Sequence, residues 1–192
     1  MAKIIAEDKN FERIIAREHP LETGEYDNCC FKHCDFSDAI FNERIFTDCR
    51  FEDCNLSMAK LRRTAFRDCT FLDCKLLGLQ FDQCNDIGLS FKFERCQLNF
   101  SNFSSCKIKK TVFKNSELQE ADFTACDLSG AVFDNCVLQR AVFDNTNLEK
   151  ADFRTAVNYC IDPEKNRIKG AKFSIAGLPG LLGKYGIEIG AE

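Results

Sequence analysis

The stretch from residue 121 to residue 153 decides the fold, and it reads ADFTACDLSGAVFDNCVLQRAVFDNTNLEKADF. A large apolar residue returns every five positions, at Phe123, Leu128, Phe133, Leu138, Phe143, Leu148 and Phe153. A small residue (Ala, Cys or Thr) stands two positions before each of these centres. A period of five fits neither the 3.6-residue turn of a helix nor the alternation of a strand. It fits a coil that turns a corner every five residues, with one large and one small side chain pointing inward on each side.

The same period extends over most of the 192 residues, and taking every twentieth residue sorts the centres into four columns. The first column is Phe31, Phe51, Phe71, Phe93, Phe113, Phe133, Phe153 and Phe173. The second is Phe36, Leu56, Leu76, Leu98, Leu118 and Leu138, and the third is Phe41, Leu61, Phe81, Phe103, Phe123 and Phe143. The fourth is Tyr26, Phe46, Phe66, Ile108, Leu128, Leu148 and Ile168. Columns this uniform predict a coil with four sides, a solenoid in which each repeat packs on its neighbours.

One irregularity interrupts the columns. Phe81 and Phe93 are twelve residues apart rather than ten, which places a two-residue insertion near residues 85–91. We expect Ile87 to supply the missing centre of the fourth column, within a double bulge in which Gly88 adopts a positive φ. The bulge is either a harmless irregularity of the coil or a kink that takes part in recognition.

Two segments carry a family resemblance. Residues 121–125 (ADFTA) and 151–155 (ADFRT) follow the pattern of a small residue, Asp or Asn, Leu or Phe, a polar residue and a variable one. The chain resembles the pentapeptide-repeat family over residues 24–173, and this resemblance implies an all-β fold, a right-handed quadrilateral β-helix.

Within that family the chain is most similar to the Qnr-type quinolone-resistance proteins, in its length and in the apolar segment from Leu178 to Ile189. The short stretch Leu56-Ser57-Met58-Ala59 also resembles one in their N-terminal half. The resemblance implies a protein that mimics DNA, binds DNA gyrase or topoisomerase IV, and dimerises through its C-terminal end. The long loops of many Qnr repeat arrays are missing between residues 26 and 153, which is a departure from their pattern.

These observations divide the chain into three parts: an N-terminal cap at residues 1–23, the β-helix at 24–174 with a looser last coil at 156–167, and a C-terminal capping and dimerisation segment at 175–192. Phe11 and Leu21 fall in phase with the columns, so the alternative for residues 1–23 is that part of them begins the first coil. The ends of monomeric solenoids are usually polar, but this C-terminal end is apolar, so we expect a homodimer. Its candidate contacts are Leu178, Leu181, Leu182, Tyr185, Ile187 and Ile189.

The composition indicates in which cellular compartment the protein is expected. No window of 18 apolar residues and no secretory signal occur, so we expect neither a membrane span nor export. Thirteen cysteines without an export signal favour the cytoplasm and free thiols. Ten of them occupy the small inward position: Cys29, Cys34, Cys49, Cys54, Cys69, Cys74, Cys96, Cys106, Cys126 and Cys136.

The segment from Cys29 to Cys34 holds four metal-capable side chains, but the register points two inward and two outward, so we expect no metal site. Cys30 points outward and is expected to react first with a thiol reagent.

Little in the sequence points to catalysis. There are two histidines, no evident nucleophile–base pair and no phosphate-binding glycine loop, so we expect no enzyme and no cofactor. The basic clusters Arg62, Arg63, Arg67, Lys107, Lys109, Lys110 and Lys114 are expected to be solvated surface charge.

Residues 115–153 contain eight acids and two bases, a net charge of −6. The acids form our candidate partner-binding surface: Glu117, Glu120, Asp122, Asp127, Asp134, Asp144, Glu149 and Asp152. An acidic rod can compete with DNA for a basic surface. With the partner that the Qnr resemblance implies, the first hypothesis is a DNA mimic that binds a type II topoisomerase, and the alternative is an interaction solenoid with an unrelated protein partner. Neither hypothesis requires direct contact with nucleic acid or a membrane.

Overall fold

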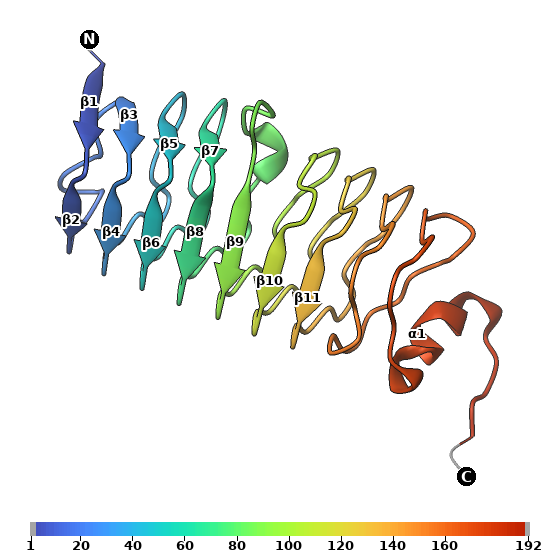
Figure 1. The fold of residues 1–192 in the computed structure, drawn as a ribbon. Coiled ribbons are helices and arrows are strands. Elements are labelled where there is room, and N and C mark those ends of the chain that lie inside the picture. The colour runs from blue at the N-terminus through green and yellow to red at the C-terminus, as the bar shows by residue number, and fades with distance from the viewer. Residues whose placement is uncertain (1–2, 191–192) are drawn as a thin grey trace.

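The protein is a rod of stacked coils, and its computed structural model describes residues 3–190 (Figure 1). Eleven strands form two parallel sheets, in the orders β1-β3-β5-β7 and β11-β10-β9-β8-β6-β4-β2. The strands are β1 (Ile4–Glu7), β2 (Asn10–Glu12), β3 (Gly24–Asp27), β4 (Cys30–Lys32), β5 (Ile45–Thr47), β6 (Arg50–Glu52), β7 (Ala65–Arg67), β8 (Cys69–Leu72), β9 (Phe91–Glu94), β10 (Val112–Lys114) and β11 (Val132–Asp134). The helical elements are the 3₁₀ turns η1 (Phe81–Gln83), η2 (Ile175–Gly177) and η3 (Gly183–Tyr185) and the short helix α1 (Pro179–Leu182).

Each strand pairs with the equivalent strand of the next coil. Phe31 lies opposite Phe51, twenty residues on, and across the insertion Phe71 lies opposite Phe93. Isolated parallel bridges continue the same register where no named strand is present, for example between Gln97 and Glu117. The corners are made by residues with positive φ, between 47° and 62° where they are not glycine. The chain is therefore the four-sided right-handed β-helix that the columns and the family resemblance predict.

The four columns form the core. Phenylalanine rings of the first column stack with centroids 4.6–5.4 Å apart, from Phe11 to Phe173. Rings of neighbouring columns meet edge to face, as Phe113 and Phe123 do at 6.1 Å. Both arrangements are favourable for aromatic pairs. The centres from Phe31 to Phe153 are fully buried, and Phe173 is partly buried at the end of the rod.

The small inward position has a hydrogen-bonding role in addition to its size. The thiols of Cys49 and Cys54 donate to the main-chain carbonyls of Tyr26 and Phe31, which are centres in the preceding coil. The hydroxyls of Thr64, Ser101 and Thr146 make the same contact. A small side chain with one donor therefore satisfies a buried carbonyl in several coils, which favours cysteine, serine and threonine at this position.

The insertion is built differently from our expectation. The side chain of Ile87 is 70% exposed and does not enter the core. Leu89 and Phe91 are buried instead, and the ring of Phe91 lies 5.7 Å from that of Phe66 in the fourth column. Phe91 pairs with Cys69, so it occupies a position that is small in the preceding coil, and it is large enough to fill the vacant column. Gly88 has the expected positive φ, 73°, which turns Ile87 outward.

Strand pairing begins earlier than residue 24. β1 pairs with β3 and β2 pairs with β4, so residues 4–12 already belong to a coil. Ala6, Ala16 and Leu21 from this stretch are buried in the core. The described part of the stretch that we assigned to an N-terminal cap is thus built as the first coil of the stack, which is the alternative that the phase of Phe11 and Leu21 indicated.

The C-terminal segment closes the other end (Figure 1). The N–H of Ile161 donates to the carbonyl of Gly180, and a side chain at Gly180 would collide with the carbonyl of Tyr159 at 2.3 Å. The ammonium of Lys184 bridges Asp162 at 2.8 Å and Glu164 at 2.5 Å. Its hydrogen bond holds the pKa of the Asp162 carboxyl below its usual value. These contacts fix α1 and η3 onto the last coil. None of the helices among residues 3–190 is both long and apolar enough to cross a membrane.

The stacked core makes a direct prediction for stability. Phe113 is fully buried between Phe93 and Phe133, so Phe113→Ala should lower the free energy of unfolding by about 3–5 kcal/mol. Phe100→Ala is the matched control, because Phe100 is exposed at a corner, and it should change stability by no more than about 0.5 kcal/mol. Denaturant unfolding measures both. Equal stability of the two variants would contradict the four-column core.

A second prediction concerns the thiols. All thirteen cysteines are free, and the ten at the small inward position are buried. Burial raises the pKa of the Cys49 thiol to about 12, which keeps it protonated and unreactive. Cys160 is exposed whereas Cys30 is only partly exposed, so Cys160 replaces Cys30 as the first site of reaction. Timed labelling with mass spectrometry should show one fast site, lost in Cys160→Ser, and ten sites that react only after unfolding.

Candidate interaction surfaces

The eight acids between residues 115 and 153 do not form one surface. The register places Asp134 and Asp152 on the first side, and Glu117 and Glu120 on the second. Asp122 and Asp144 lie on the third side, and Asp127 and Glu149 lie on the fourth. Consecutive pentads face successive sides of the rod, so acids that are close in sequence are distributed around it. The sequence-based acidic surface is therefore corrected: the structure spreads it over all four sides.

Half of these acids are also paired with basic groups. Ion pairs join Glu120 to Arg140 at 3.4 Å, Asp127 to Lys109 at 3.3 Å, Glu149 to Arg167 at 2.8 Å and Asp152 to Arg154 at 2.7 Å. The hydrogen bond from Arg154 lowers the pKa of the Asp152 carboxyl. Several of these partners lie outside residues 115–153, so the net charge of that segment overstates the local field.

A different group of acids does share one surface. Six carboxylates lie on the fourth side near the N-terminal end, along and beside the sheet β1-β3-β5-β7, and we call them the acidic strip: Glu7, Asp8, Glu25, Asp27, Asp48 and Asp68. All six side chains are exposed, and none makes an ion pair with any residue in the described range 3–190. Asn28 donates to Asp8 at 2.6 Å and Ser90 donates to Asp68 at 2.9 Å, which holds two of them along one corner.

The acidic strip was missed because its members are dispersed over 62 residues of sequence, among bases that, except for Arg67, face other sides. Reading only the outward positions of the fourth column, every twentieth residue, would have found it. The unpaired carboxylates create a negative field along one edge of the rod, and this field suits a basic partner.

The C-terminal end offers an apolar surface. Leu178, Tyr185, Ile187 and Ile189 are each about half exposed, as a surface for a partner requires. Leu181 and Leu182 are partly buried, and Leu181 packs against the core, so it acts mainly in closing the rod. Ile175, which our candidate list omits, is 88% exposed. Ile175 lies two residues after the centre Phe173, a position that points outward in the repeat, so the sequence could have identified it.

A cavity of about 630 Å³ lies near the N-terminal end between the first two coils, and Arg44 lines it. This buried guanidinium takes a position that is small in most coils, and it donates to the main-chain carbonyls of Leu21 and Glu22. Arg44 therefore completes the irregular first coil. In the part of the chain that the structure describes, no group of three or more His, Cys, Asp or Glu side chains could hold a metal ion.

Comparisons with known proteins agree with this architecture. The family model described as pentapeptide repeat region matches residues 25–103, 44–123 and 90–173. The chain is similar to a solved structure of trypsin-treated QnrB1, a plasmid-mediated fluoroquinolone resistance protein, with 20% identity over 98% of this chain and 92% of that one, and a TM-score of 0.63. A second trypsin-treated QnrB1 structure matches with 18% identity over 97% and 98% of the two chains, and a TM-score of 0.53.

No curated protein sequence matches the chain significantly. The repeat model nevertheless covers most of its length, and the fold agrees over almost all of it. On this basis the chain belongs to the pentapeptide repeat family.

Proposed function

We propose that this protein is a non-enzymatic, cytoplasmic DNA mimic that binds a type II topoisomerase, DNA gyrase or topoisomerase IV, through the acidic strip on its fourth side. The observation that carries the proposal is the strip itself: six exposed carboxylates in register with no basic partner among residues 3–190. The likeness in fold to QnrB1, a fluoroquinolone resistance protein, supports the choice of partner class. The thirteen free thiols fit a reducing compartment.

The charge density of the strip is about half that of double-stranded DNA and close to that of one of its strands. Stacked strands lie about 4.8 Å apart, so six charges on four successive coils give roughly one charge per 3 Å. Double-stranded DNA carries one charge per about 1.7 Å of axis. A basic groove that recognises the phosphate backbone therefore meets a field of the same sign, with a charge spacing close to the value of about 3.4 Å for a single strand.

The test is a charge reversal with a matched control. Glu7→Lys, Glu25→Lys and Asp27→Lys together change the strip by six charges at positions with ordinary φ. Glu117→Lys, Asp134→Lys and Asp144→Lys make the same change at acids spread over three sides. We expect the strip variant to bind gyrase at least tenfold more weakly and to lose salt dependence, and the control to stay within about threefold.

Binding is measured by titration at two salt concentrations, with gyrase supercoiling assays run with and without a fluoroquinolone. Equal losses in the two variants would mean that net charge, rather than the strip, is recognised. Absence of binding by the wild type to gyrase and to topoisomerase IV would refute the proposal in favour of a solenoid with an unrelated protein partner.

We further propose that the chain forms a homodimer through its C-terminal end. The exposed apolar side chains there include Ile175, Leu178 and Ile187, and burying such groups against a second copy removes them from water. Ile175→Ser, Leu178→Ser and Ile187→Ser together should convert the dimer to a folded monomer in multi-angle light scattering. The same changes at Ile40 and Val142, which are exposed on the third side, should leave the mass unaltered. A wild-type mass of about 22 kDa at all concentrations would exclude this dimer.

A further inference from the structure

The fourth side changes the sign of its charge at the bulge. From Glu7 to Asp86 its outward positions hold seven acids and Arg67, a net charge of −6. Beyond the bulge, from Lys107 to Lys169, they hold six bases and two acids, a net charge of +4. The bases are Lys107, Lys109, Lys110, Lys150, Arg167 and Lys169, and all six are exposed.

The basic half is regular in its geometry. At one corner lysine alternates with glycine from coil to coil, and a Cβ at Gly130 or Gly170 would lie 3.4 Å from the Cγ of Lys110 or Lys150, respectively. The glycines leave room for each stem to lie along the corner with its ammonium group in solvent. Within residues 3–190, Lys107, Lys110, Lys150 and Lys169 make no ion pair, so most of the positive charge is not neutralised within the chain.

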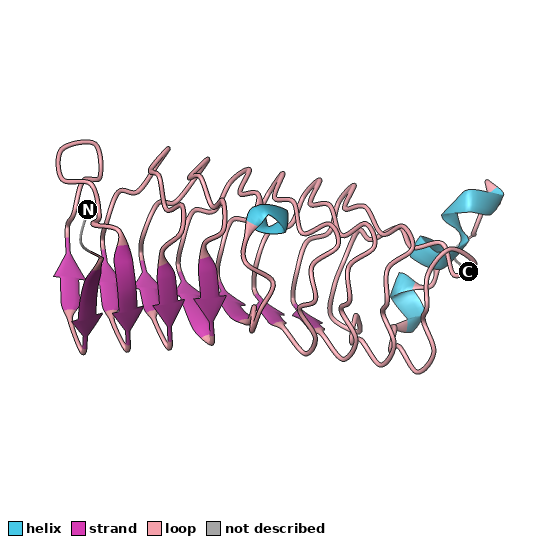
Figure 2. Ribbon diagram, turned by 90° about the horizontal axis from the view of Figure 1, so that it is seen from above, coloured by secondary structure: helices cyan, strands magenta, loops and turns pink. Residues whose placement is uncertain are grey.

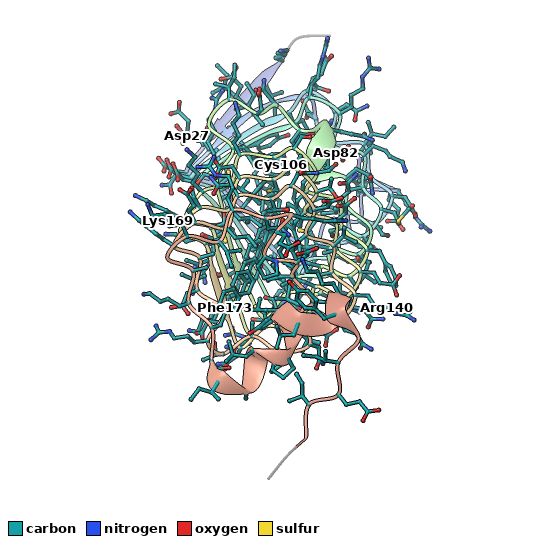
Figure 3. The ribbon with its side chains drawn as sticks, turned by 90° about the vertical axis from the view of Figure 1, so that its right-hand side faces the viewer. Asp27, Asp82, Cys106, Arg140, Lys169 and Phe173 are labelled. Atoms are coloured by element: carbon teal, nitrogen blue, oxygen red, sulfur yellow. The ribbon has the colours of Figure 1, made fainter. Side chains whose placement is uncertain are left out.

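The two halves lie on one flank of the rod. In Figure 3 the C-terminal end of the rod faces the viewer. Asp27 and Lys169 lie on the same flank and Arg140 lies on the opposite one. The other sides lack this division. The second side, for example, has acids in both halves, at Asp35 and Asp38 and at Glu117 and Glu120. The separation of charge is therefore particular to the fourth side.

We propose that the fourth side is a self-complementary docking surface for a second copy of this chain, placed antiparallel about a two-fold axis at the bulge. This arrangement sets the acidic half of each copy against the basic half of the other, as an isologous contact requires. Ile87, 70% exposed near the middle of this side, then meets its equivalent at the axis. The outward turn of the bulge at Gly88 thus provides an apolar contact at the centre of a charged interface.

This inference goes beyond the proposed function and does not require a topoisomerase. The lateral contact uses the acidic strip, so it would compete with a partner that binds there. It is also distinct from the C-terminal contact: charge attraction across the fourth side weakens with added salt, whereas apolar association at the end of the rod does not.

The experiment is a charge swap in the full-length protein. Glu7→Lys, Glu25→Lys, Asp27→Lys and Asp48→Lys change the acidic half from −6 to +2, and Lys107→Glu, Lys110→Glu and Lys169→Glu change the basic half from +4 to −2. The fourth side of the first variant is then positive throughout, and that of the second is negative throughout. We expect each variant alone to lose the lateral association that the wild type shows at 50 mM salt, with at least a tenfold higher dissociation constant.

Mixing the two variants should restore the association, because the positive fourth side of the first variant then faces the negative fourth side of the second. Sedimentation velocity with one variant fluorescently labelled measures it, and the C-terminal contact is the same in all samples. Ile87→Ser should weaken the wild-type association several-fold, and Ile40→Ser, the exposed control on the third side, should not. A wild-type mass that does not change between 50 and 500 mM salt, or a mixture that associates no more than its components, would overturn the proposal. If the protein does not bind a topoisomerase but the mixture of the two variants still associates, the proposed lateral contact is supported and only the proposed function fails.

Discussion

The structure depends on one constraint: each coil must stack on the next in register, so every inward side chain lies on its own equivalent. Phe31, Phe51 and Phe71 meet face to face for this reason. The hydrogen bonds follow the same geometry. Each coil donates main-chain N–H groups to the next, as Phe36 does to Asn55, and the small inward residue donates back to a buried carbonyl. Figure 2 shows the result, a row of parallel coils with a short helical turn near the middle of the rod and helices at its C-terminal end.

The same constraint explains how far the sequence could be interpreted. Inward positions must repeat, so the columns, the burial of Phe113 and the four-sided coil could be predicted from periodicity alone. The packing of the bulge could not be predicted in this way, because the two inserted residues interrupt the five-residue spacing by which a centre is recognised. Ile87 and Phe91 are both large and apolar, and only the packing of the Phe91 ring against Phe66 and Phe81 decides between them. The start of the first coil was obscured similarly, since small Ala6 and Ala16 take centre positions in β1 and after β2.

The prediction of an acidic surface at residues 115–153 was wrong for a different reason. Charge summed along a segment measures a surface only when the segment stays on one face, and in this fold consecutive pentads face four directions. Asp122 and Asp127 are five residues apart but occupy different sides, whereas Glu7 and Asp27 are twenty apart and lie in adjacent positions of one sheet. Surface properties of a β-helix are therefore found by following each side along the rod. That procedure identifies the acidic strip and the change of sign beyond the bulge.

Core and surface are nearly independent in this architecture, which matters for function. Two of every five residues point inward and satisfy the stack, so the other three can change charge without disturbing it.

The two proposed contacts have opposite consequences for a partner that binds the acidic strip. Association at Ile175 and Leu178 leaves the acidic strips free at the far ends of a longer rod. Antiparallel association across the fourth side covers both strips with the lysines of the partner copy. Because only the second contact is weakened by salt, ionic strength would determine how much of the protein presents the acidic strip to other molecules.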